Sequence, residues 1–108
     1  QSPDRIEIYK VNEKPALPGG ESALKSYQNI NVKYPVEERE NCIQGRVIVQ
    51  FIIEKDGSIS DVKISESVNP SFDREALRVV KAMPKWNPGK LQGIPARVKN
   101  EVPVVFRF

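Results

Sequence analysis

The stretch from Gly45 to Ser65, GRVIVQFIIEKDGSISDVKIS, decides the fold of this chain. Its first half alternates apolar with other side chains, and β-branched and aromatic residues favour a half-buried strand. The alternating positions are Val47, Val49, Phe51 and Ile53. Asp56-Gly57 then favours a two-residue type I′ turn, so the stretch is predicted to be a β-hairpin. With that turn Lys55 lies opposite Ser58, and the pairs on the apolar face are Phe51 with Val62 and Val49 with Ile64.

The opposite face of the hairpin is predicted to be polar except for Ile48, Ile52 and Ile59. Either the N-terminal segment covers these three side chains or they form a contact surface, and coverage is the preferred interpretation. We therefore expect a monomer when Gln1–Asn31 is present and a tendency to associate when it is deleted.

Three further elements surround the hairpin. Glu21–Ile30 is predicted to be an amphipathic helix, and a second short helix is predicted to begin at Pro35. Phe72–Met83 carries the clearest helical pattern and is expected to cover the apolar face of the hairpin. Ala96–Phe108 returns to alternation, which predicts a third strand. The expected fold is therefore α+β, with a three-stranded antiparallel sheet packed against helices.

Length and composition indicate one domain, because the chain has 108 residues, 39% hydrophobic and 29% charged. Residues 1–20 are interpreted as the end of a linker with a hint of a short strand, and residues 21–108 as the domain. A net charge of +3 is too small to predict a nucleic-acid partner. The chain begins at Gln1 without an initiator Met, so we expect a piece of a longer protein.

The residue inventory predicts no enzyme activity and no cofactor. The chain has no His, which removes the commonest general base and metal ligand. The single cysteine, Cys42, cannot build a zinc site and is expected to be a buried or half-buried thiol. Trp86 is expected to fold back onto the core after the helix ends.

Pro103 predicts where a partner binds. Proline has no N–H, so in a sheet it belongs on an edge strand with its nitrogen pointing away from the neighbour. The amides of Lys99 and Glu101 should then point outward too, and an exposed edge can accept a partner strand. Because Pro103 should end that ladder, the predicted contact is confined to Arg97, Val98, Lys99, Asn100, Glu101 and Val102. Arg97 and Lys99 favour an acidic peptide.

An ordered series of short motifs resembles the C-terminal domain family of TonB. The motifs are Tyr34-Pro35, Gln44-Gly45-x-Val47-x-Val49-x-Phe51, Asp56-Gly57, Phe72-Asp73-x-Glu75-Ala76, Met83-Pro84-x-Trp86-x-Pro88-Gly89 and the closing Val-Pro-Val-Val-Phe. Ahead of them, Pro18-Gly19-Gly20 resembles the extension of the Bacteroidetes branch.

The resemblance implies a periplasmic module tethered to the inner membrane by an N-terminal segment and a Pro-rich linker. It implies partnership with the ExbB and ExbD motor proteins, and binding of the TonB box of outer-membrane transporters by strand addition at the third strand. In the family, the Tyr34-Pro35 pair lies near the box-binding region. The Gln-Pro that usually precedes it is replaced by Asn31-Val32, so contacts from those positions are not carried over.

The resemblance also leaves a rival interpretation open. Similar domains occur at the C-terminus of BlaR-like membrane zinc peptidases, where the catalytic zinc site lies elsewhere in the chain. The sequence preceding Gln1 would separate the two, because a single membrane helix with a Pro-rich linker indicates a transducer, whereas an His-Glu-x-x-His motif indicates a peptidase.

Overall fold

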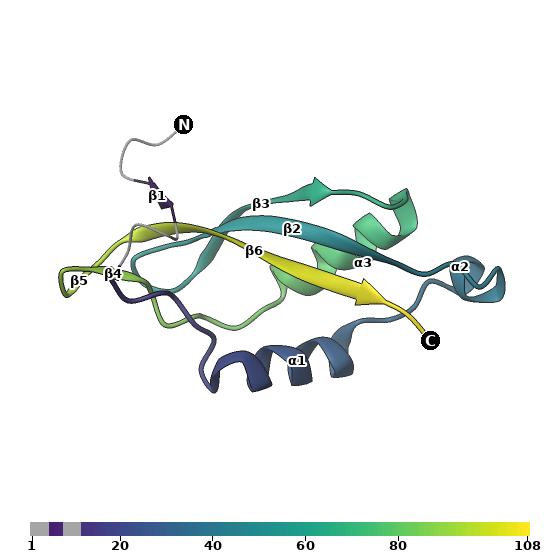
Figure 1. Cartoon of the computed structure of the whole chain (residues 1–108), viewed down its shortest axis with the longest axis horizontal. Coiled ribbons are helices and arrows are strands. Elements are labelled where there is room, and N and C mark those ends of the chain that lie inside the picture. The colour runs from purple at the N-terminus through teal and green to yellow at the C-terminus, as the bar shows by residue number, and fades with distance from the viewer. Residues whose placement is uncertain (1–4, 8–11) are drawn as a thin grey trace.

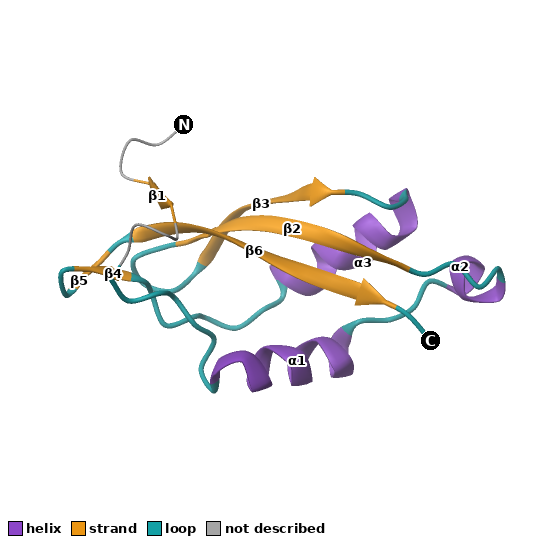
Figure 2. Cartoon of the chain, in the orientation of Figure 1, coloured by secondary structure: helices purple, strands orange, loops and turns teal. Residues whose placement is uncertain are grey.

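The computed structural model describes residues 5–7 and 12–108. Its elements are β1 (Arg5–Glu7), α1 (Gly20–Asn31), α2 (Val36–Glu40), β2 (Gly45–Ile53), β3 (Ile59–Glu66), α3 (Pro70–Lys81), β4 (Lys90–Leu91), β5 (Ile94–Pro95) and β6 (Arg97–Phe106). The main sheet has the order β1-β6-β2-β3. α3 packs against this sheet, α1 lies beside β6, and α2 lies at the far end, near the C-terminus (Figure 1; Figure 2).

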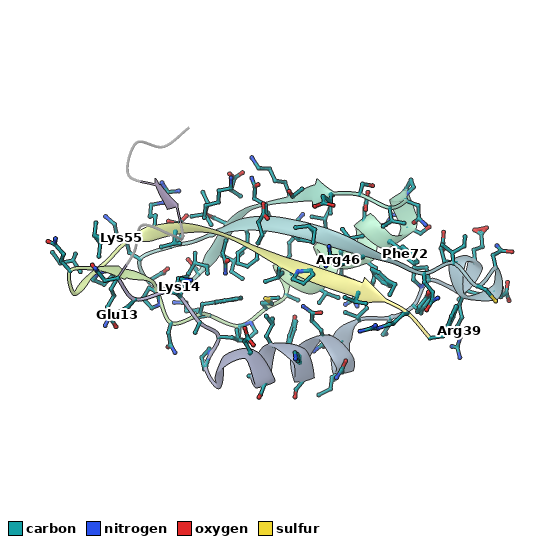
Figure 3. The ribbon with its side chains drawn as sticks, in the orientation of Figure 1. Glu13, Lys14, Arg39, Arg46, Lys55 and Phe72 are labelled. Carbon is teal, nitrogen blue, oxygen red and sulfur yellow. The ribbon has the colours of Figure 1, made fainter. Side chains whose placement is uncertain are left out.

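The three antiparallel strands predicted from the sequence are confirmed as β6, β2 and β3. Their shared apolar face meets α3, and the side chains buried between them belong to one cluster. Within it, Phe72 of α3 (labelled in Figure 3) stacks on Phe106 of β6 with ring centroids 4.2 Å apart. Trp86 is 6% exposed and packs on Phe51, as expected of a residue that folds back onto the core.

The predicted turn of the hairpin is wrong by one residue. Glu54 pairs with Ser58, since the Glu54 N–H donates to the Ser58 carbonyl (2.8 Å), and the loop is Lys55-Asp56-Gly57. Gly57 alone of these three has a positive φ, 90°. The loop therefore matches the three-residue type, in which a type I turn is followed by a glycine at positive φ. Lys55 consequently does not lie opposite Ser58.

A bulge in β3 restores the predicted pairing after the one-residue difference at the turn. Gln50 pairs with Lys63 but Ile52 pairs with Ser60, so Asp61 and Val62 together lie opposite Phe51. Asp61 has a φ of 52°, the left-handed conformation that accommodates the extra residue. Beyond this bulge the predicted pair of Val49 with Ile64 is present.

The bulge also changes the face of Ile59. The prediction that Ile59 shares the polar face with Ile48 and Ile52 is wrong, because Ile59 packs against the core cluster. Ile52 is 4% exposed on the opposite face. α1 contacts α3 on the helix side, so α1 is not the cover that was expected for Ile48 and Ile52. The predicted association after deletion of residues 1–31 stays a prediction.

The N-terminal segment contributes to the domain before residue 21. Leu17 is 5% exposed and belongs to the core cluster, although the sequence placed it in a linker. The backbone of Glu13 forms an isolated β-bridge with that of Lys90, and the backbone of Ala16 forms one with that of Asn87. Of the strand hinted at near Ile6–Tyr9, residues 8–11 lie outside the described residues. Cys42 is exposed, which contradicts the expected buried or half-buried thiol.

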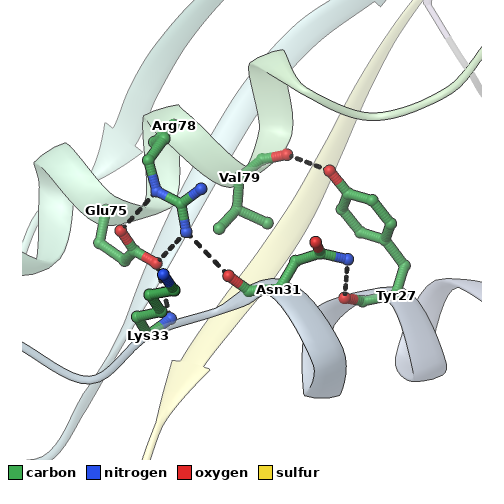
Figure 4. Close-up of polar contacts among 6 residues, drawn as sticks. All are labelled: Tyr27, Asn31, Lys33, Glu75, Arg78 and Val79. Carbon is green, nitrogen blue, oxygen red and sulfur yellow. Dashed lines mark hydrogen bonds and ion pairs between the residues drawn. The ribbon is translucent and has the colours of Figure 1, made fainter.

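α1 is fixed to α3 by polar contacts from its last turn and the residues after it (Figure 4). The Tyr27 hydroxyl donates to the Val79 carbonyl (2.8 Å), and the Arg78 guanidinium donates to the Asn31 carbonyl (2.8 Å). The same guanidinium donates to both Glu75 oxygens, and the Lys33 N–H donates to Glu75 Oε2 (2.6 Å). Glu75 is thus the centre of the junction between the two helices.

The contacts of Glu75 make the free energy of unfolding depend on pH. Burial opposes ionisation of Glu75, but the hydrogen bonds from Arg78 and Lys33 outweigh it and lower the pKa from 4.5. Because the folded-state pKa is depressed, this stabilisation is complete above about pH 4.5 and is lost as the pH falls through the folded value. Glu75→Gln should therefore cost about 1–2 kcal/mol of unfolding free energy at pH 7, the worth of a charged hydrogen bond.

The measurement is denaturant unfolding at pH 7 and pH 3. The deficit of the variant should shrink as the pH is lowered from 7 to 3, because protonation of Glu75 removes the stabilisation that its ionised carboxylate provides. Glu66→Gln, at an exposed carboxylate of β3, provides the control and should lose less than ~0.5 kcal/mol at either pH. An equal deficit of Glu75→Gln at both pH values would contradict the ionic role.

Candidate strand-addition site on β6

β6 directs alternate backbone groups outward, away from β2. The carbonyl of Pro103 accepts a hydrogen bond from Gln28 Nε2 of α1 (3.1 Å), so this residue faces outward. The Glu101 N–H donates to the side-chain Oδ1 of Asn100 (2.9 Å) and is likewise turned away from β2. The same alternation directs Arg97, Lys99 and Val105 outward. The direction predicted from Pro103 is therefore the one that the strand adopts.

The expectation that residues 96–108 form an edge strand holds only beyond Lys99. β1 pairs in parallel with the first part of β6, and Arg5, Ile6 and Glu7 lie beside Arg97, Val98 and Lys99. The chain thus supplies its own strand at the place predicted for a partner. Sequence reasoning missed this because the two segments lie about ninety residues apart, and only a sparse apolar pattern marked the first of them.

The remaining edge is partly capped by side chains. The Glu101 N–H already donates to the Asn100 side chain, and the Pro103 carbonyl already accepts from the Gln28 side chain. Pro103 itself has no N–H. Capping of this kind protects an edge from indiscriminate pairing. No feature of the sequence singled out Gln28, because its role depends on where α1 lies.

The predicted site residues on β6 divide between the two faces of the sheet. Val98 is fully buried and Val102 is 3% exposed, so both belong to the core and neither can offer its side chain to a partner. Arg97 is half-buried and its Nε donates to Glu54 Oε1 (2.6 Å). This ion pair offsets the charge that was expected to attract an acidic peptide. Glu101 is exposed and accepts from Ser65 Oγ (3.3 Å).

Tyr34 and Pro35 do not join this group. Tyr34 packs edge-on against Phe72 and Phe106 and stacks on Phe108, and its hydroxyl donates to the Ile43 carbonyl. Pro35 precedes α2 as its N-cap. Phe106 is four residues beyond Val102 and nine beyond Arg97, so along β6 Tyr34 lies about 13 Å from the near end of the predicted contact and about 30 Å from its far end.

Figure 3 labels Lys55 of the hairpin loop toward one end of the molecule and Arg39 of α2 at the other.

A groove of about 650 Å³ runs between α1 and the second half of β6. Its lining combines apolar side chains with charges of both signs, and consists of Glu21, Leu24, Lys25, Gln28, Asn29, Val32, Tyr34, Pro103, Val105, Phe106 and Arg107. The groove follows the edge beyond Pro103, so a segment that lies along β6 could extend into it. Tyr34 touches the site only here.

Neither a metal-binding cluster nor a membrane-spanning helix is found in the part of the chain that the structure describes. Across residues 5–7 and 12–108, no three His, Cys, Asp or Glu side chains gather where they could hold a metal ion. In the same part of the chain, no helix is both long and apolar enough to cross a membrane.

Residues 30–108 match the family model described as Gram-negative bacterial TonB protein C-terminal. The chain belongs to the TonB C-terminal family. The expected family is confirmed, and its match includes β2, β3, α3 and all of β6. β1 and most of α1 lie outside it, so these two elements are features that the family model does not cover.

A curated relative supports the assignment. Protein TonB of Pseudomonas aeruginosa is 43% identical over 75 residues, which are 65% of this chain and 21% of that protein. The chain therefore spans about a fifth of the length of this TonB.

Two solved TonB domains resemble the structure. The solution structure of Helicobacter pylori TonB-CTD (residues 179–285) has a TM-score of 0.60 at 23% identity and covers 79% of this chain and 77% of that one. The solution structure of Pseudomonas aeruginosa TonB CTD has a TM-score of 0.52 at 29% identity and covers 70% and 77%.

Proposed function

We propose that this domain is the periplasmic binding module of a TonB energy transducer. In this proposal it grips the TonB box of outer-membrane transporters by strand addition and passes on energy derived from the proton-motive force for substrate uptake. The preceding part of the protein anchors it to the inner membrane and contacts the ExbB/ExbD motor complex. Membership of the TonB C-terminal family supports this role, and the observation that carries it is the outward-directed edge of β6.

The edge suits an extended peptide better than a globular surface. Outward backbone groups at Arg97, Lys99 and Glu101 recur every second residue, which is the spacing of a strand that adds to a sheet. Backbone bonds then supply affinity, and the groove beside α1 offers apolar and charged contacts for the side chains that follow. The domain itself acts as a binding module and not as an enzyme. The rival role, as an accessory domain of a zinc peptidase, gains no support from the relatives described above.

Lys99→Pro tests the proposal directly. Its amide points away from β2, so proline there should leave the β2–β6 ladder intact while removing one donor from the edge. The probe is a set of synthetic ten-residue peptides copied from the N-terminal segments of outer-membrane transporters of the source bacterium. In an amide NMR titration of the native chain, Lys99 and Glu101 should shift most, and Lys99→Pro should weaken binding at least tenfold.

Lys99→Ala is the matched control, because it removes the charge and keeps the amide. It should bind within about threefold of the native chain if backbone pairing dominates. Two results would argue against this site: normal binding by Lys99→Pro, or shifts that gather on Ile48–Ile52 of β2.

A further inference from the structure

β1 occupies part of the edge that the proposed function needs. Its three residues run parallel to β6, and Ile6 lies beside Val98. Beyond Lys99 the edge is capped by Asn100, by Gln28 and by the proline ring of Pro103. β1 therefore pairs with the stretch of the edge that precedes these caps.

The backbone of Ile6 is the main link between the two strands. In a parallel ladder, one residue bonds to the two residues that flank its partner. Because Arg97 and Lys99 point outward, the Ile6 N–H is directed at the Arg97 carbonyl and the Lys99 N–H at the Ile6 carbonyl. The amides of Arg5 and Glu7 point away from β6. One substitution at Ile6 can therefore release the strand, and one at Glu7 should not.

The contact is short compared with the rest of the sheet. β1 pairs through three residues, whereas β2 and β6 pair through nine. A short peripheral strand opens at a small fraction of the cost of global unfolding. The chain nevertheless keeps β1 close. Glu13, six residues after Glu7, is held to Lys90 by an isolated antiparallel β-bridge between their backbones. This tether gives β1 a high effective concentration at the edge.

We propose that β1 is an intramolecular competitor for the strand-addition site. A partner strand takes the place of Arg5–Glu7 along Arg97–Lys99, in the parallel direction that β1 now has, and β1 returns when the partner leaves. The inference rests on the proposed function for the identity of the partner, but the pairing of β1 belongs to this chain alone. A ligand can bind only molecules in which β1 has left β6. β1 therefore raises the apparent Kd by the reciprocal of the fraction of molecules in that open state.

The experiment compares three full-length chains: the native chain, Ile6→Pro and Glu7→Pro. Hydrogen exchange of the Lys99 amide, without peptide, reports whether β1 is paired. We expect protection in the native chain and in Glu7→Pro, and fast exchange in Ile6→Pro. Titration with the transporter peptides should then give an affinity about three- to tenfold higher for Ile6→Pro than for the other two, since about two backbone bonds no longer compete.

Each other outcome overturns the inference or the proposed function. Equal Lys99 exchange in all three chains would show that β1 does not pair with β6. Fast exchange in Ile6→Pro with unchanged affinity would show that the partner does not use the place of β1. If no chain binds the transporter peptides, the proposed function fails. The competition is then decided by a peptide of residues 1–11, which should bind Ile6→Pro and not the native chain; failure to bind overturns it.

Discussion

Gly57→Ala should destabilise the domain by about 3 kcal/mol or more, because its backbone lies against that of Trp86. A β-carbon on Gly57 would lie 2.0 Å from the Trp86 carbonyl oxygen, a separation that no real contact reaches. The Trp86 N–H also donates to the Gly57 carbonyl (2.8 Å), so the two segments cannot move apart without losing that bond. Chemical denaturation of the variant and the native chain measures the loss.

Gly93→Ala separates the clash from backbone strain. Gly93 also has a positive φ, 80°, but a β-carbon there meets no atom within 4 Å. It should cost about 1 kcal/mol, the usual penalty of a left-handed conformation for a residue with a side chain. Similar losses for the two variants would mean that the Trp86 contact adds nothing.

Phe51→Ala is expected to cost about 3–5 kcal/mol, as truncation of a buried aromatic side chain does. Phe51 is fully buried at the middle of β2, and its ring packs against Trp86 with centroids 5.6 Å apart. The bulge at Asp61 places two residues of β3 opposite it, so the cavity would open in the centre of the sheet. Denaturant melts again give the measurement.

Phe108→Ala is the matched control, since Phe108 is 64% exposed although it stacks on Tyr34. It should lose less than ~1 kcal/mol. A loss of that size for Phe51→Ala would instead place Phe51 outside the core.

The elements of the fold could be predicted because their signals are local. Alternation along β2 and β6 and the helical spacing of α3 each predict which face is buried, and the three agree. α3 begins at Pro70, two residues before the predicted range, and the Asn69 side chain caps it by accepting from the Phe72 N–H (2.8 Å). Patterns of this kind need no knowledge of distant residues.

The turns could not be predicted because distant contacts decide them. Asp56-Gly57 has the composition of a type I′ turn, yet the contact of Gly57 with Trp86 accompanies a three-residue loop. A two-residue turn with two positive φ angles occurs instead at Gln92-Gly93, between β4 and β5, within a segment interpreted as loop.

Half of the candidate site could be read from one residue. Pro103 predicts which backbone groups of β6 point outward, since a missing N–H excludes the inward direction. It carries no information on what lies outside. Three contacts each join segments far apart in the chain: the pairing of β1 with β6, the hydrogen bond from Gln28 to Pro103 and the ion pair of Arg97 with Glu54. No local sequence pattern predicts any of them.

The loop of the hairpin and the bulge in β3 each hold one residue that the pairing of the strands does not need, which has a consequence for changes in chain length. Deleting Lys55 would leave the two-residue loop Asp56-Gly57 between Glu54 and Ser58. Deleting Asp61 would leave Val62 alone opposite Phe51, while the neighbouring pairs of the ladder stay as they are. In both cases the buried side chains keep their faces. Deletions at these two positions are therefore expected to be independent of each other, and a relative can lack one of the two residues and keep the other.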